Sequence, residues 1–173
     1  GASNVPWVAG EGYNPGNINT RGLNLQVSPS TETSQDAAGL GAYFFGSLTT
    51  DSQFDLTSAD GTFGMYVFPT SARAKIHTSS NQNFTGLTNA AGAYSVYRSG
   101  STTTKLFGPD GAQRGSTNTT ASATPTAVAL WLGAAGGSGL TADRTIRASW
   151  VLGSAITESD IDTLHDLLDA FFE

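Results

Sequence analysis

The chain has 173 residues, no cysteine and a formal net charge of −6. This length suits a single domain with a full hydrophobic core, and the lack of cysteine excludes disulfides and thiolate metal sites. No apolar run approaches the ~20 residues of a membrane span. Because there is no basic patch to meet phosphates, we do not expect nucleic acid as a partner.

The first residues, 1–22, are rich in turn-forming Asn, Gly and Pro. We predict an irregular N-terminal arm there, followed by one sandwich domain over residues 23–173. The arm carries Trp7 and Tyr13, two aromatic residues that no strand core explains. It lies either on its own body or against a neighbouring subunit.

The first half of the domain contains five short segments with strand composition or alternation, separated by polar turns. The segment between the first two, residues 29–41, has the composition of a polar loop. The predicted strands are residues 23–27, 42–46, 53–56, 62–68 and 72–77.

The second half continues as hairpins, with a Pro-Asp-Gly turn at residues 109–111. Its predicted strands are residues 92–98, 103–107, 112–117, 127–133 and 144–153. About ten short strands without intervening helices predict an all-β, antiparallel sandwich. In the last strand, four alternating residues are expected on one core-facing side: Ile146, Ala148, Trp150 and Leu152.

One amphipathic helix is predicted at residues 158–172. Thr157 followed by Asp160 has the pattern of a shortened capping box. Its apolar stripe is expected to comprise Ile161, Leu164, Leu168 and Phe171, widened by Leu167 and Phe172. The segment also carries six acids and no base, which indicates either a solvated face or a contact for a basic partner.

Candidate ligand-binding residues are few. Trp131 and Trp150 lie within alternating strand sequence, so we expect both in the core. Trp7 and Tyr13 in the arm, and Tyr97 with Arg98 before a turn, are the predicted contacts for a sugar, whose apolar ring faces stack on aromatic side chains.

No catalytic, metal-binding or cofactor-binding constellation is predicted, and we expect the protein not to be an enzyme. The chain has only four Glu, and none forms the strand-borne carboxylate pair that glycoside hydrolysis uses. Two histidines, His77 and His165, are expected at surface or edge positions, and no motif marks a serine nucleophile. A rim calcium ion is left open, because no dense Asp cluster predicts one.

The order of segments over about residues 63–172 resembles the laminin-G-like or concanavalin A-like jelly-roll domains of bacteriophage tail and virion proteins and of secreted bacterial modular proteins. The resemblance rests on residues 93–98, 104–107, the Pro-Asp-Gly turn, 127–133, 146–153 and the capped helix after Ile156. It implies a jelly-roll sandwich closed by a short C-terminal helix.

The function implied by this resemblance is a non-enzymatic attachment or structural module. The leading hypothesis is a phage structural protein at the virion surface that binds a host glycan or docks on other virion or surface proteins, as a homo-oligomer. The alternatives are a carbohydrate-binding module of a secreted, extracellular hydrolase and, third, a small glycosidase.

If the arm mediates assembly, removing residues 1–22 will convert an oligomer to a monomer. Edge strands of a sandwich need cover, and a neighbour's arm would supply it. The measurement is the mass in solution of the full and truncated chains. Two monomeric masses would show that the arm packs on its own body.

Overall fold

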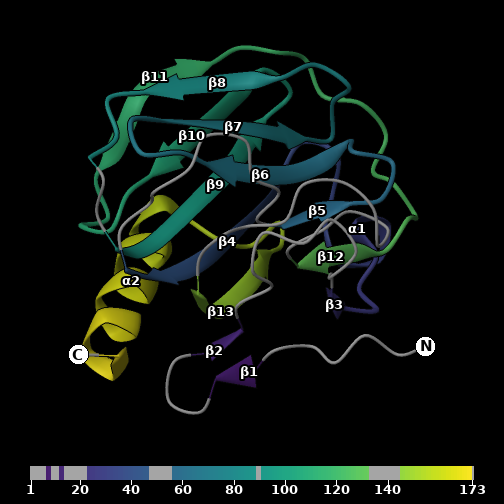
Figure 1. Ribbon diagram of the computed structural model, residues 1–173. Helices are drawn as coiled ribbons and strands as arrows, with labels where there is room; N and C mark the ends of the chain where they lie inside the picture. The colour runs from purple at the N-terminus through teal and green to yellow at the C-terminus, as the bar shows by residue number, and fades with distance from the viewer. Residues whose placement is uncertain are drawn as a thin grey trace.

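The computed structural model describes residues 7–8, 12–13, 23–46, 56–88, 91–132 and 145–172. Within them, two antiparallel sheets pack face to face, and a C-terminal helix covers the outer face of one sheet (Figure 1). The predicted all-β sandwich with a terminal helix is therefore confirmed.

Sheet A is the larger sheet. In the described part of the chain its strands follow the order β1 (Trp7–Val8), β2 (Gly12–Tyr13), β13 (Thr145–Leu152), β4 (Ala38–Phe45), β9 (Gly92–Gly100), β10 (Thr103–Phe107) and β11 (Gln113–Asn118). Helix α2 (Glu158–Phe172) lies against this sheet, next to β9.

Sheet B is the smaller sheet and packs on the inner face of sheet A. Its order is β3 (Leu23–Asn24), β12 (Leu130–Leu132), β5 (Leu56–Ser58), β6 (Phe63–Val67), β7 (Ser71–Ile76) and β8 (Gln82–Thr85). A single helical turn, α1 (Pro29–Glu32), precedes β4.

The main core fills the space between the sheets. Burial of each large apolar side chain there contributes about 1.5–3 kcal/mol. Its largest members are fully buried and come from both sheets, and include Leu40, Phe44, Leu56, Phe63, Met65, Ile76, Phe84, Tyr94 and Leu106.

A β-bulge in β13 changes which residues face this core. Ile146 pairs with Phe44 but Ala148 pairs with Tyr43, which leaves Arg147 as the extra residue. Ile146 consequently lies in the main core, whereas Trp150 and Leu152 pack in a second cluster beneath α2. The prediction that these residues share one face was wrong, because the bulge shifts the alternation by one residue.

The extra residue of the bulge holds the end of α2. The Arg147 guanidinium lies 3.9 Å from the centroid of the Phe45 ring, and its Nη1 donates a hydrogen bond of 2.9 Å to the Phe172 carbonyl. The Phe172 ring in turn packs on Tyr43, with 4.7 Å between centroids. The bulge therefore positions a cation where the last turn of the helix presents free carbonyls.

Helix α2 begins and packs partly as predicted. Thr157 and Asp160 exchange hydrogen bonds in a capping box: Thr157 N and Oγ1 donate to Asp160 Oδ2 at 2.8 and 2.6 Å. Ile161 is fully buried, but Phe171 is 79% exposed and Leu167 is 64% exposed. The predicted place of Phe171 in the buried stripe was wrong, because the stripe continues to Phe172 instead.

His165 takes the centre of the buried stripe and has no solvent exposure, so its predicted surface position was wrong. His165 Nδ1 donates to the Gly108 carbonyl at 2.8 Å, and Nε2 lies 2.8 Å from Ser95 Oγ. Ser95 Oγ also accepts a 3.1 Å hydrogen bond from Trp150 Nε1. With a neutral imidazole, every polar atom of this chain of hydrogen bonds has a partner.

The start of β4 differs from its predicted boundary for a steric reason. The predicted loop over 29–41 contains α1 and the start of β4, where Gly39 and Gly41 give loop-like composition to a buried strand. A Cβ at Gly41 would lie 2.3 Å from the Trp150 ring, so glycine is what lets the indole lie across β4. β8 was not predicted at all.

Two other predicted strands are shorter in the structure than in the sequence analysis. The first predicted strand ends at Asn24, and residues 127–129 precede rather than join β12. Residues 53–55 and 133 lie outside the described residues. Within the predicted irregular arm, β1 pairs with β2, and Tyr13 of β2 pairs with Ile146 of β13, so this part of the arm extends the chain's own sheet.

The sandwich is closed along one side, where β8 of sheet B meets β11 of sheet A. Gly115 makes this approach possible, because a Cβ there would lie 2.8 Å from the Thr85 carbonyl oxygen. Gly115 also has a φ of 64°, which favours glycine.

We predict that Gly41→Ala destabilises the fold by about 1–3 kcal/mol through overpacking against Trp150. The displaced indole should lose its bond to Ser95, so Trp fluorescence and the protection of α2 amides should both change. The control is Gly100→Ala, where the nearest contact of a Cβ is an ordinary 3.6 Å. Equal melting temperatures for the two variants would contradict the packing argument.

Candidate functional site

The outer face of sheet B is the candidate binding surface. Leu130 and Leu132 point into the core, so Trp131 between them points outward, and it is half-buried. The expected core position of Trp131 was therefore wrong. Register places Trp131 opposite Thr57 and Asn24 on the neighbouring strands of the sheet.

The row continues across the sheet from Thr57 to Gly64 and then to Lys75. Thr57 and Gly64 are buried, whereas Lys75 is half-buried. The row therefore has an aromatic ring at one end, a floor of small residues in the middle and an ammonium group at the other end.

A second row lies beside the first on the same face. Tyr66 pairs with Arg73, and Arg73 pairs with Asn83. Tyr66 is half-buried, while Arg73, Asn83 and the nearby Thr85 are exposed. Together the two rows, which we call the outer face of sheet B, combine aromatic rings with amide, hydroxyl and cationic groups.

The predicted ligand residues lie elsewhere. Trp7 and Tyr13 belong to β1 and β2 at the edge of sheet A, and their side chains are outside the described part of the structure. Tyr97 is 5% exposed, and its hydroxyl donates a 2.7 Å hydrogen bond to the Ile156 carbonyl beneath α2. Tyr97 therefore lies inside the fold and not at an exposed position before the turn.

Arg98 is also inside the fold, with no solvent exposure. Its guanidinium donates to backbone carbonyls of three segments, at distances of 2.9 to 3.2 Å: Ile76, Gly100, Ser101 and Thr120. Burial lowers its pKa, and the charge of Asp36 opposes this effect. With four backbone carbonyls as partners, this buried guanidinium acts as a structural tie inside the fold.

His77 lies beside Arg98 and is 1% exposed, which corrects its predicted surface position. Thr33 Oγ1 donates to the Pro29 carbonyl, so it accepts from His77 Nε2 at 2.8 Å. Within the described residues, His77 Nδ1 has no hydrogen-bond partner. Burial, together with the Arg98 charge, lowers the pKa of His77 to about 4.

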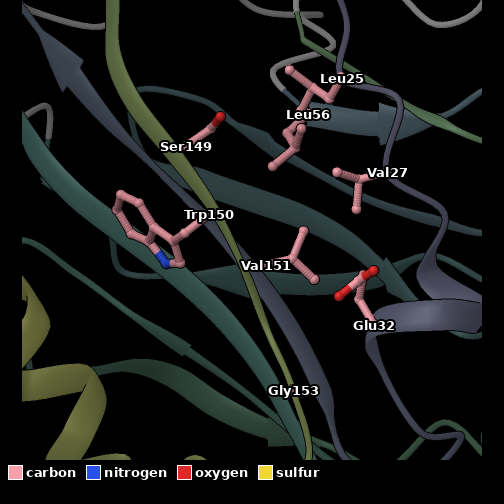
Figure 2. Close-up of a pocket in the computed structure, with 8 residues that line it drawn as sticks. All are labelled: Leu25, Val27, Glu32, Leu56, Ser149, Trp150, Val151 and Gly153. Atoms are coloured by element: carbon pink, nitrogen blue, oxygen red, sulfur yellow. The ribbon is translucent and has the colours of Figure 1, made fainter.

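A cavity of about 590 Å³ opens between the two sheets along β13. Figure 2 shows Val27, Leu56 and Val151 around it, with the Glu32 carboxylate contributed from α1 and the Trp150 ring turned to the other side of β13. Its lining is mainly aliphatic, and no aromatic ring faces it in this view. The cavity therefore has fewer of the groups that recognise a sugar than the outer face of sheet B has.

The Ser95–His165 pair has the hydrogen bond of a nucleophile and its base, but both residues have no solvent exposure. A substrate cannot reach Ser95 while α2 is docked. Among the described residues, no group of three or more His, Cys, Asp or Glu is placed to hold a metal ion. Within the same residues, no helix is long and apolar enough to cross a membrane.

No family model matches the chain, and no curated protein matches it. Among solved structures, it is similar to Trypanosoma rangeli sialidase in complex with 2,3-difluoro-KDN, with a TM-score of 0.65 and 13% identity over 93% of this chain. It spans only 28% of that sialidase chain.

A second similar structure is domain 4 of AbnA, a GH43 extracellular arabinanase from Geobacillus stearothermophilus, in complex with arabinotriose. The TM-score is 0.57 and the identity 14%, over 86% of this chain and 75% of that one. At these identities the likeness shows the fold alone. The structural neighbours of this sandwich therefore include domains of carbohydrate-related proteins, and none of those described here is a phage protein.

We predict that acidification destabilises the protein between pH 6.5 and about 4. The unfolded chain protonates His77 near pH 6.5, whereas the folded chain resists protonation until about pH 4. Stability is therefore full above pH 6.5 and falls by up to about 1.4 kcal/mol per pH unit within this window. Burial lowers the pKa of His165 as well, which acts in the same direction.

The measurement is chemical denaturation as a function of pH. His77→Asn should flatten the slope, since Asn tolerates the φ of 51° at this position. Asp160→Asn serves as the control: the Thr157 hydrogen bonds lower the pKa of Asp160 from 3.8, outside the window. An unchanged slope in His77→Asn would contradict the assignment.

Proposed function

We propose that this chain is a non-catalytic carbohydrate-binding β-sandwich whose ligand lies on the outer face of sheet B. The observation that carries the proposal is the outward position of Trp131, on a face that also bears Tyr66 and several hydrogen-bonding side chains. Sugars present apolar ring faces and polar edges, which such a combination binds.

The geometry of the two sheets supports this location. The inner faces form the core, and α2 covers the outer face of sheet A with a second apolar cluster. The outer face of sheet B carries exposed polar side chains on β7 and β8. It is therefore the face of the sandwich on which a flat, extended ligand finds both rings and polar groups.

The structural neighbours are compatible with the proposal. The similar arabinanase domain was solved with arabinotriose, and T. rangeli sialidase was solved with sialic acid. We propose the same broad class of ligand for this chain. The jelly-roll, concanavalin A-like architecture implied by the sequence resemblance is part of the proposal and is supported by the two antiparallel sheets with their terminal helix.

We place the module at the outside of a particle or cell, where glycans are met. A carbohydrate-binding module of an extracellular hydrolase is the version that the structural neighbours favour. The role of a phage virion protein, docked on other copies or on other virion proteins, rests on the sequence features alone.

The test measures the affinity of the protein for a panel of neutral and acidic polysaccharides by affinity electrophoresis and calorimetry. Trp131→Ala and Tyr66→Ala should each weaken binding by about tenfold, the effect of removing a central aromatic contact. The matched control is Phe171→Ala, which removes an exposed aromatic ring from α2. Melting curves show whether each variant is folded.

If both variants bind as tightly as wild type, the ligand does not lie on this face. If no polysaccharide binds, the carbohydrate proposal is overturned. Release of reducing sugar from any member of the panel would revive the glycosidase alternative and contradict the non-catalytic assignment.

A further inference from the structure

Two cations lie together on the outer face of sheet B. In β7, Ala72, Ala74 and Ile76 are buried in the core, so the alternating Arg73 and Lys75 both point to the other side. Residues two apart on a strand are separated by about 7 Å along it. This spacing brings a guanidinium and an ammonium group within reach of one ligand.

Neither of these cations has a counter-ion in the described part of the chain. Lys105 pairs with Glu158 and Arg114 pairs with Asp110. The buried guanidinium of Arg98 and that of Arg147 donate to backbone carbonyls. Among the described residues, no carboxylate or backbone carbonyl contacts the charged end of Arg73 or Lys75.

The partners of β7 in the sheet supply rings and hydrogen-bonding groups but no carboxylate. Tyr66 and Asn83 flank Arg73, and Gly64 lies opposite Lys75. Asp60, in the turn between β5 and β6, has both carboxylate oxygens in hydrogen bonds with Ser58, Thr62 and Thr126.

Protection of a sheet edge does not explain the pair. Lysines often protect exposed edge strands from pairing with other chains. β7, however, is hydrogen-bonded on both sides, to β6 and to β8. Arg73 and Lys75 therefore form a locally positive patch on an interior strand, in a protein whose net charge is −6.

We infer that the ligand of this face is an anionic glycan, in which a carboxylate or sulfate group meets Arg73 and Lys75 while a sugar ring lies on Tyr66 or Trp131. The inference rests on the proposed function and specifies its ligand class. The planar guanidinium of Arg73 suits a bidentate contact with either kind of anion. The Phe68 ring, 5.4 Å from the Arg73 guanidinium carbon, steadies that side chain.

The experiment uses pairs of probes that differ only in charge. Polygalacturonate is compared with its fully methyl-esterified form, and heparin with desulfated heparin, by calorimetry on the whole chain at low and at high salt. Wild type should bind the charged member of at least one pair more tightly, and the preference should shrink at high salt. The two pairs distinguish a carboxylate ligand from a sulfate ligand.

Arg73→Gln and Lys75→Gln should each reduce binding of the charged probe roughly fivefold, the effect of one exposed charged contact. Both should leave binding of the neutral probe unchanged. Arg73→Lys should keep part of the preference and lose less than Arg73→Gln, because the charge stays but the bidentate geometry is lost. Arg114→Gln is the control, because it removes the same charge from β11 of the other sheet.

The outcomes separate this inference from the proposed function. Equal affinity of wild type for charged and neutral forms overturns the anionic ligand and leaves glycan binding intact. Equal losses in Arg73→Gln and Arg114→Gln also overturn it, because net charge would then explain the preference. If the wild-type protein binds none of these probes and no neutral sugar of the wider panel, both the anionic ligand and the proposed glycan binding are overturned.

Discussion

The hydrogen-bond chain from Trp150 through Ser95 to His165 determines how the outer face of sheet A is covered. Each sheet has two faces, and packing the sheets together covers only one of each. The chain of hydrogen bonds, with Ile161 and Leu152 around it, holds α2 on the outer face of sheet A. On the outer face of sheet B, by contrast, the described residues include the exposed polar side chains Arg73, Asn83 and Thr85.

A second internal tie holds the opposite end of the sandwich. Arg98 joins the end of β7, the β9–β10 turn and the long connection after β11 through four backbone carbonyls. A charge this deeply buried is tolerated because carbonyl dipoles surround it. Burial, reinforced by the Arg98 charge, lowers the pKa of the neighbouring His77, so the two residues form one pH-sensitive unit at the end of the strand that carries Arg73 and Lys75.

The fold class could be predicted from the sequence because hydrophobic alternation and turn residues are local signals. The capping box at Thr157 and the bounds of α2 were predicted for the same reason. What failed depended on contacts distant in sequence. The beginning of β4 has the composition of a loop because Gly41 must leave room for an indole more than a hundred residues away.

The candidate site was missed for a related reason. A tryptophan between two leucines gives no sign of which residues of the strand face the core, and register against β5 decides it. Alternation within β7 is a local signal, but only the sheet order shows that Tyr66 and Asn83 lie beside Arg73 on one face. Tyr97 and Arg98 were predicted as sugar contacts before a turn because the sequence does not show that α2 and the connection after β11 lie against them.

The single histidine in the buried stripe of α2 also specifies where along its axis the helix docks. A shift of one turn would bring Ile161 or Asp169 to the place of His165. Isoleucine would leave the Ser95 hydroxyl proton without its His165 acceptor and would remove one of the two donors to the Gly108 carbonyl, and aspartate would bury a charge. Purely apolar contacts would let the helix slide among several positions of similar energy. The hydrogen bonds of His165 make the shifted positions unfavourable, so the helix docks at one position along its axis.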